Sequence, residues 1–135
     1  MTLTRFLLSY AVTLPIFFAI DLVWLAVVAK GFYRQHLGHL LAPQVNWAAA
    51  ILFYLVFIAG IVFFAVRPAL ETHSAMRALA YGAFFGFLAY ATYDLTNQAT
   101  IRDWPLVVTV VDLVWGSALS ATVAYLSYQA SSRIG

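Results

Sequence analysis

The sequence predicts an all-α membrane protein, a four-helix transmembrane bundle with short antiparallel connections that forms one domain over residues 1–135. Composition is the first observation: 64% of the residues are hydrophobic and 9% are charged, whereas a soluble domain has about 25% charged residues. The second observation is that four segments reach the roughly 20 largely apolar residues that a transmembrane helix needs. The predicted spans cover about residues 6–28, 47–66, 76–97 and 106–127.

The first span follows Arg5 and contains Pro15 and Asp21. Its apolar run is longer than the roughly 7–15 residues of a secretory signal peptide, and a signal peptide would not carry an acid there. We therefore expect a retained helix that is kinked or locally opened at Pro15.

Residues at the ends of the other spans fit helix boundaries. Arg67-Pro68 is expected to close the second span, and Ser74 is expected to cap the third. Pro105 lies in the first turn of the fourth span, with Asp103 at its positive end.

The longest connection, residues 30–46, predicts one short interfacial helix. Its apolar residues recur at roughly helical spacing with polar residues between them, a pattern typical of a helix that lies in the headgroup region. These apolar residues are Phe32, Tyr33, Leu37, Leu40 and Leu41.

Charged and metal-binding residue types exclude several classes of function. The net charge of +2 comes from scattered basic residues that form no stripe, so we expect no nucleic acid as a partner. The chain has no cysteine and therefore no disulfide or thiolate site. His36 and His39 have a spacing that can bind metal, but neither a cysteine nor a carboxylate lies beside them. We expect no metal and no cofactor.

Three acidic residues fall within the predicted spans: Asp21, Asp94 and Asp112. At about 1.5 Å per residue, Asp21 lies about 10 Å before the end of the first span and Asp112 about 9 Å after the start of the fourth. Asp94 is near the end of the third span on the same side. We expect the three to converge in one leaflet, with Asp21 and Asp112 facing one cavity and Asp94 nearer the headgroups. Ionisable residues at such depth are functional candidates.

Aromatic and amide side chains gather at the same depth and complete a candidate ligand-binding site. Two of them belong to a repeated tetrapeptide, Asp-Leu-Val-Trp, at 21–24 and 112–115, whose spacing places each tryptophan beside its own aspartate. Chance repetition and an inverted repeat both remain open. The candidate ligand-binding residues are Asp21, Asp94, Asp112, Asn97, Tyr54, Tyr90, Trp24 and Trp115; the catalytic residues, if any, are not indicated.

Small residues mark one face of each of the last two spans. Gly82 and Gly86 lie four residues apart in the third span, and Gly116 and Ser120 do so in the fourth. Such faces permit close approach of membrane helices, so we expect these two helices to touch there.

The stretch from Ala89 to Pro105, which contains Tyr-Asp-Leu-Thr-Asn, resembles a bacterial family of integral membrane proteins, domain of unknown function 2177. Val111-Asp-Leu-Val-Trp-Gly116, Phe32-Tyr33 with Leu37-Gly38, and Phe64-Ala-Val-Arg-Pro-Ala-Leu70 resemble it as well. The resemblance covers nearly the whole chain. It implies a small polytopic bacterial membrane protein and no particular activity.

Orientation and localisation follow from charge and from this resemblance. Four arginines, at positions 5, 67, 77 and 133, lie on one side against Lys30, Arg34 and Arg102 on the other. This slight excess favours cytoplasmic termini in a multi-pass protein of the cell inner membrane, with dual insertion still open.

Three kinds of function fit this sequence. The first is a membrane protein that binds or moves a proton, a cation or an amphiphilic ligand at the carboxylates. The second is a structural or accessory subunit whose polar cluster fixes packing, and the third is an enzyme acting on a lipid or isoprenoid with paired carboxylates. No motif names a reaction, so an enzyme is the least favoured. The expected partners are the lipid bilayer and a small cationic or amphiphilic ligand, and a homo-oligomer stays open.

Overall fold

The computed structural model describes residues 1–134, and these residues form helices without any strand. The helices are α1 (Leu3–Val23), α2 (Phe32–Leu37), α3 (Trp47–Ile61), α4 (Arg67–Thr72), α5 (Ala75–Thr100) and α6 (Leu106–Ile134). Two π-helical turns extend them: Trp24–Val28 continues α1, and Val62–Val66 joins α3 to α4. The all-α class predicted from the sequence is confirmed.

Side-chain caps fix the starts of three long helices. Thr2, Asn46 and Ser74 accept hydrogen bonds from backbone N–H groups three residues later, at 3.1, 3.1 and 3.2 Å. Each cap satisfies one of the backbone donors that a helix start leaves unpaired. The predicted cap at Ser74 is confirmed.

The second predicted span is longer than expected. We expected Arg67-Pro68 to close it, but helical structure continues through both residues to Thr72. Pro68 occupies the first turn of α4, directly after the π-helical turn. A proline at the start of a helical segment removes no needed hydrogen bond, so the chain passes Pro68 without ending the helix.

Three helices are long and apolar enough to cross a membrane, among the residues that the structure describes: Leu3–Val28, Trp47–Thr72 and Leu106–Ile134. The predicted fourth span corresponds to α5, which has 26 residues. Its length suffices, but α5 carries more polar side chains and is not one of the three. The first span runs as a continuous helix through Pro15.

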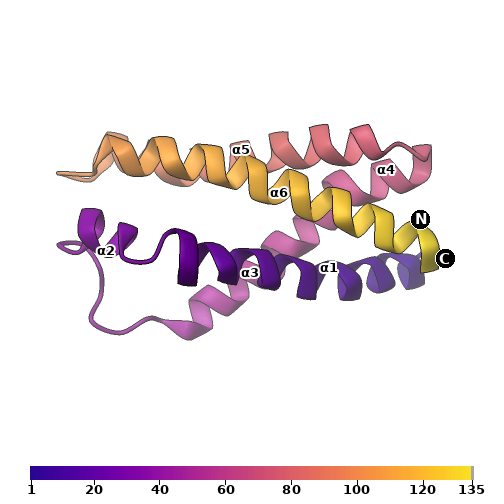
Figure 1. The fold of residues 1–135 in the computed structure, drawn as a ribbon, viewed down its shortest axis with the longest axis horizontal. Coiled ribbons are helices and arrows are strands. Elements are labelled where there is room, and N and C mark those ends of the chain that lie inside the picture. The colour runs from indigo at the N-terminus through magenta and orange to yellow at the C-terminus, as the bar shows by residue number, and fades with distance from the viewer. Residues whose placement is uncertain (135) are drawn as a thin grey trace.

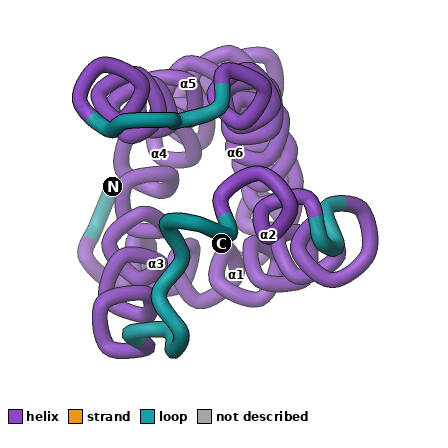
Figure 2. Tube along the Cα trace, turned by 90° about the vertical axis from the view of Figure 1, so that its left-hand side faces the viewer, coloured by secondary structure: helices purple, strands orange, loops and turns teal. Residues whose placement is uncertain are grey.

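The long helices pack side by side, with both termini at one end and α2 at the other (Figure 1). Viewed from the α2 end, α5 and α6 lie above α1 and α3 (Figure 2). The α5–α6 contact is the most extensive, and α1 also packs along α6. Large buried side chains between the helices, including Phe17, Ile58 and Leu119, form the core.

Glycines allow α5 and α6 to approach closely. A Cβ atom at Gly82 would lie 2.6 Å from the backbone oxygen of Ser120, and one at Gly86 would collide with the backbone oxygen of Gly116. The predicted contact between these two helices is therefore confirmed. This close packing sets the positions of Asp94 and Asp112, which lie on the same helices toward the α2 end.

Candidate functional site

Three helices supply the buried aspartates. Asp21 on α1, Asp94 on α5 and Asp112 on α6 are 6%, 0% and 5% exposed. No ion pair between any of them and a lysine, arginine or histidine is present within residues 1–134, where the ion pair found is Arg67–Glu71. The three carboxyl groups thus lie in a poorly solvated region without a basic partner from the described chain.

Asp112 is held by a short chain of hydrogen bonds that runs from Trp24 through Tyr33 of α2. The Tyr33 hydroxyl donates to Asp112 Oδ1 at 2.6 Å, and the Trp24 indole N–H donates to the Tyr33 oxygen at 3.2 Å. Burial raises the pKa of the Tyr33 phenol, and the bond to Asp112 raises it further. Tyr33 therefore remains a protonated donor near neutral pH.

Asp21 has its own donors. The Trp115 and Tyr54 side chains, which both carry a donor, lie beside its carboxylate. Donors beside a buried carboxylate reduce the cost of its burial. We predicted that Asp21 and Asp112 face one cavity; the structure instead gives Asp21 a separate set of partners.

The two Asp-Leu-Val-Trp segments are linked across the bundle. Trp24 and Trp115 stack with ring centroids 4.3 Å apart and planes 9° from parallel. Trp115 lies beside Asp21. Trp24 donates to Tyr33, which in turn donates to Asp112. We expected each tryptophan to lie beside the aspartate of its own segment; the polar contacts of the indoles lead instead to the aspartate of the other segment. Antiparallel packing of α1 against α6 brings the segments to one level, so each tryptophan reaches the other aspartate.

Asp94 differs most from its expectation. We placed it nearer the headgroups, yet it is completely buried, and neither of its oxygens has a hydrogen-bond donor among the described residues. Its carboxyl lies within hydrogen-bonding reach of the Asp112 carboxyl. Two carboxyl groups can bond to each other only when one of them carries a proton. Asp94 and Asp112 therefore form the close pair that we had expected of Asp21 and Asp112.

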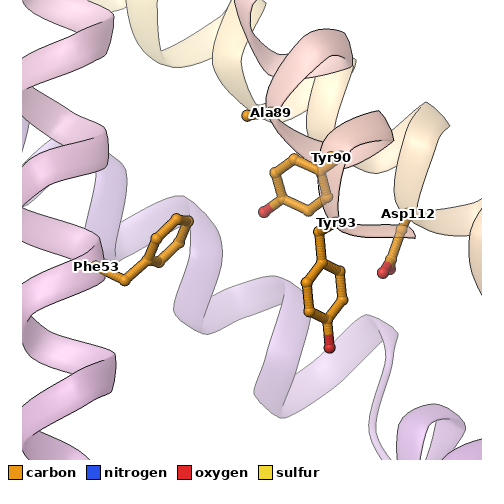
Figure 3. Close-up of a pocket in the computed structure, with 5 residues that line it drawn as sticks. All are labelled: Phe53, Ala89, Tyr90, Tyr93 and Asp112. Carbon is orange, nitrogen blue, oxygen red and sulfur yellow. The ribbon is translucent and has the colours of Figure 1, made fainter. Parts of the chain in front are cut away.

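A pocket of about 290 Å³ opens beside Asp112. Its walls are aromatic: Phe53 of α3 lies on one side, Asp112 on the other, and Tyr90 and Tyr93 of α5 lie between them (Figure 3). Phe53 and Tyr93 are each about half exposed at 50% and 54%, so the pocket is open toward the outside of the bundle. Asp112 is the charged side chain of this lining.

The remaining predicted residues lie around this pocket. Tyr90 lines it and packs against Gly116. Asn97 lies one turn beyond Tyr93 on α5 and hydrogen-bonds to that tyrosine rather than to Asp94. Gln98 belongs to a different network, in which Trp104 Nε1 donates to Thr109 and Thr109 donates to Gln98. That network holds the turn between α5 and α6.

Three aromatic residues of the site were not among those predicted: Tyr33, Phe53 and Tyr93. Tyr33 had a usable signal, because a tyrosine on the apolar side of a short helix can direct its hydroxyl at the bundle. Tyr93 precedes Asp94 and lies one turn from Tyr90. Phe53 carried no signal, since its helix is apolar on all sides.

Metal-binding geometry is absent from the described part of the chain. No three His, Cys, Asp or Glu side chains gather there closely enough to hold an ion. His36 and His39 contact the backbone oxygens of Phe32 and Asp103, at 3.0 and 3.3 Å. The polar chemistry of the site is thus that of carboxyl, phenol and indole groups.

Comparison with known families agrees with the observed fold and composition. A family model described as a predicted membrane protein, DUF2177, matches residues 6–129. The chain belongs to this family. The match includes all three aspartates of the DUF2177 site and every residue that lines its pocket. No curated protein and no solved structure matches the chain.

Proposed function

We propose that this DUF2177 protein binds an amphiphilic organic cation in one leaflet, with the charged group beside Asp112. The observation that carries the proposal is that Asp112 lies in an aromatic pocket without a basic partner in the described chain. Burying an unpaired charge costs several kcal/mol or more. A cation from outside the chain, or a proton, offsets this cost.

The aromatic walls favour an organic cation over a small metal ion. Faces of Phe and Tyr rings attract ammonium groups, most strongly where water is excluded. Phe53, Tyr90 and Tyr93 supply such rings around the carboxylate. Hard metal ions instead require several oxygen ligands, and the pocket offers one carboxylate.

The size and the opening of the pocket support an amphiphile. A volume of about 290 Å³ is near the lower limit of roughly 300 Å³ for small-molecule sites, so it suits a headgroup rather than a whole lipid. The half-exposed rings of Phe53 and Tyr93 leave the outer side open. An apolar tail attached to the cation would extend there among lipid chains.

This function includes a topology. We propose that α5 is a fourth span that crosses the inner membrane beside α6, because it has 26 residues and packs along α6. Asp94, the acid of α5, is completely buried and faces protein rather than lipid. The basic residues near both termini favour a cytoplasmic location for the terminal end.

A structural role is the second candidate, and the site of Asp21 supports it. Asp21 has two donors from other helices, so its carboxylate holds α1, α3 and α6 in register without any ligand. We propose that Asp21 is structural and that Asp112 binds the cation. An enzyme with Asp94 and Asp112 as acid and base is less favoured, because Asp94 does not line the pocket and Asp112 alone would meet a substrate there.

The test compares probes of equal tail length on purified protein in nanodiscs. We expect octyltrimethylammonium to raise the melting temperature with a saturable dose dependence, while octanol and octyl sulfate do not. Equal shifts with all three probes would indicate a nonspecific effect of the tail and contradict the proposal.

A further inference from the structure

Four buried serine hydroxyls lie outside the carboxylate site and have no hydrogen-bond partner among the described residues: Ser9, Ser120, Ser127 and Ser131. Their side chains are 5% exposed or less. Buried polar atoms of native proteins are almost always hydrogen-bonded, to protein or to ordered water. Four such atoms in one region therefore indicate a polar partner that is not part of the chain.

These hydroxyls lie on the buried faces of α1 and α6: Ser9 and Ser131 line one hollow between these helices, whereas Ser120 lies against Gly86 of α5. On α6, steps of four or three residues lead from Asp112 through Gly116, Ser120, Ala124 and Ser127 to Ser131, so these residues share one face. On α1, steps of four lead from Asp21 through Phe17 and Thr13 to Ser9. We call Ser9, Thr13, Ser120, Ser127 and Ser131 the hydroxyl row. The Thr13 hydroxyl donates to the Ser9 backbone oxygen at 2.6 Å, which leaves its oxygen free to accept.

One end of the hydroxyl row opens at the face of the bundle where both termini lie (Figure 1). Ser9 and Ser131 line a shared hollow of about 10 Å³ there, beside Arg5. This volume is on the order of the space that one water occupies, and a buried water needs two or more polar partners. The hollow offers the two serine hydroxyls.

The other end of the hydroxyl row stops below the carboxylates. On α1, the completely buried Phe17 lies between Asp21 and Thr13. On α6, Gly116 lies between Asp112 and Ser120, and Tyr90 of α5 packs against it. The rings of Phe17, Phe57 and Tyr90 contact in sequence, with centroids 5.8 and 6.2 Å apart. An aromatic layer thus separates the hydroxyl row from the Asp94–Asp112 pair.

We propose that the hydroxyl row is a water-filled half-path that leads from the terminal face of the membrane to the aromatic layer beneath Asp112. Its use as a route for a proton to or from that carboxylate rests on the function proposed above. The pocket reaches the carboxylate pair from one side of the aromatic layer, and the half-path ends on the other side of that layer. The carboxylate pair then lies between a route from the pocket and a route from the terminal face.

The dry alternative is that each serine turns its hydroxyl onto the carbonyl four residues earlier in its own helix, as serines in membrane helices do. The hydroxyl row would then be a packing surface. Thiol hydrogen exchange separates the two cases, because a thiol exchanges its proton for deuterium only when water reaches it. The chain has no cysteine, so a single introduced thiol gives an unambiguous infrared S–H band.

The experiment uses Ser127→Cys and Ser131→Cys in the full chain, reconstituted in nanodiscs and transferred to D2O. Ile58→Cys is the matched control, because Ile58 is completely buried in the apolar core on α3, a helix that contributes no residue to the hydroxyl row. We expect both row thiols to exchange at least about tenfold faster than the control, which exchanges only through local opening. Circular dichroism and size-exclusion chromatography establish that each variant is folded.

Exchange of Ser127→Cys as slow as that of Ile58→Cys would overturn the half-path. The octyltrimethylammonium titration is run on the same variants and keeps the two proposals apart. Slow exchange with retained ammonium binding contradicts the half-path alone. Fast exchange without ammonium binding supports the half-path and contradicts the cation site.

Discussion

At the α2 end of the bundle two of the three buried acids, Asp21 and Asp112, lie beside aromatic donors, whereas at the terminal end the buried serine hydroxyls have no partner among the described residues. Both regions lie on the same helices, α1 and α6 above all. The difference shows how one interface can serve two purposes. A pocket forms where rings from α2, α3 and α5 surround the acids. Where small residues replace those rings, the helices pack closely around the hydroxyl row.

The largest expected effect concerns the close contact between α5 and α6 at Gly86. Gly86→Ala places a methyl group against the backbone oxygen of Gly116, whereas Gly60→Ala meets only the edge of the Phe85 ring, which can move. We expect Gly86→Ala to lower the free energy of unfolding by about 3 kcal/mol more than Gly60→Ala, as overpacking does. Denaturation in mixed micelles gives both values; similar losses would show that α5 and α6 are not in rigid contact.

The second prediction divides the acids themselves. Asp21→Asn replaces a carboxylate that lies beside two donor side chains, Trp115 and Tyr54, so we expect a loss of about 2 kcal/mol. Asp94→Asn places an amide donor beside Asp112, where the aspartate had no donor, so we expect stability to be unchanged or higher. Melting temperatures in detergent provide the comparison. If both variants lose stability equally, the two aspartates are not differently satisfied.

The smallest effect concerns Tyr33. Tyr33→Phe removes the hydroxyl that donates to Asp112, and we expect a loss of about 1.5 kcal/mol. Tyr81→Phe is the control, because Tyr81 is 43% exposed. Equal melting temperatures for the two variants would show that the Tyr33 hydroxyl of α2 does not stabilise the carboxylate site.

The sequence predicted which level of the bundle would hold the acids but not which side chains would meet. Depth follows from counting residues along each span, so Asp21, Asp94 and Asp112 could be assigned to one half. The partners depend on how each helix is rotated about its axis. A helix that is apolar on all sides, such as α3, carries no signal of that rotation, and Phe53 was missed for this reason.

Spacing within one helix was also a poor guide to contacts between helices. Trp115 lies three residues from Asp112, yet it also lies beside Asp21 on α1. Asp94 was placed by its distance from the span end, although the closeness of α5 and α6 at Gly86 decides its burial. The small-residue faces did predict that closeness, because their meaning depends on residue size alone.

The most direct test of the central claim is a calorimetric titration of octyltrimethylammonium into the parent protein, Asp112→Asn and Asp103→Asn. Both variants remove one carboxyl group, but Asp103 lies exposed in the turn between α5 and α6. We expect Asp103→Asn to bind like the parent and Asp112→Asn to bind at least about tenfold more weakly, the effect of about 1.4 kcal/mol. Equal affinity in all three proteins would contradict a cation site at Asp112.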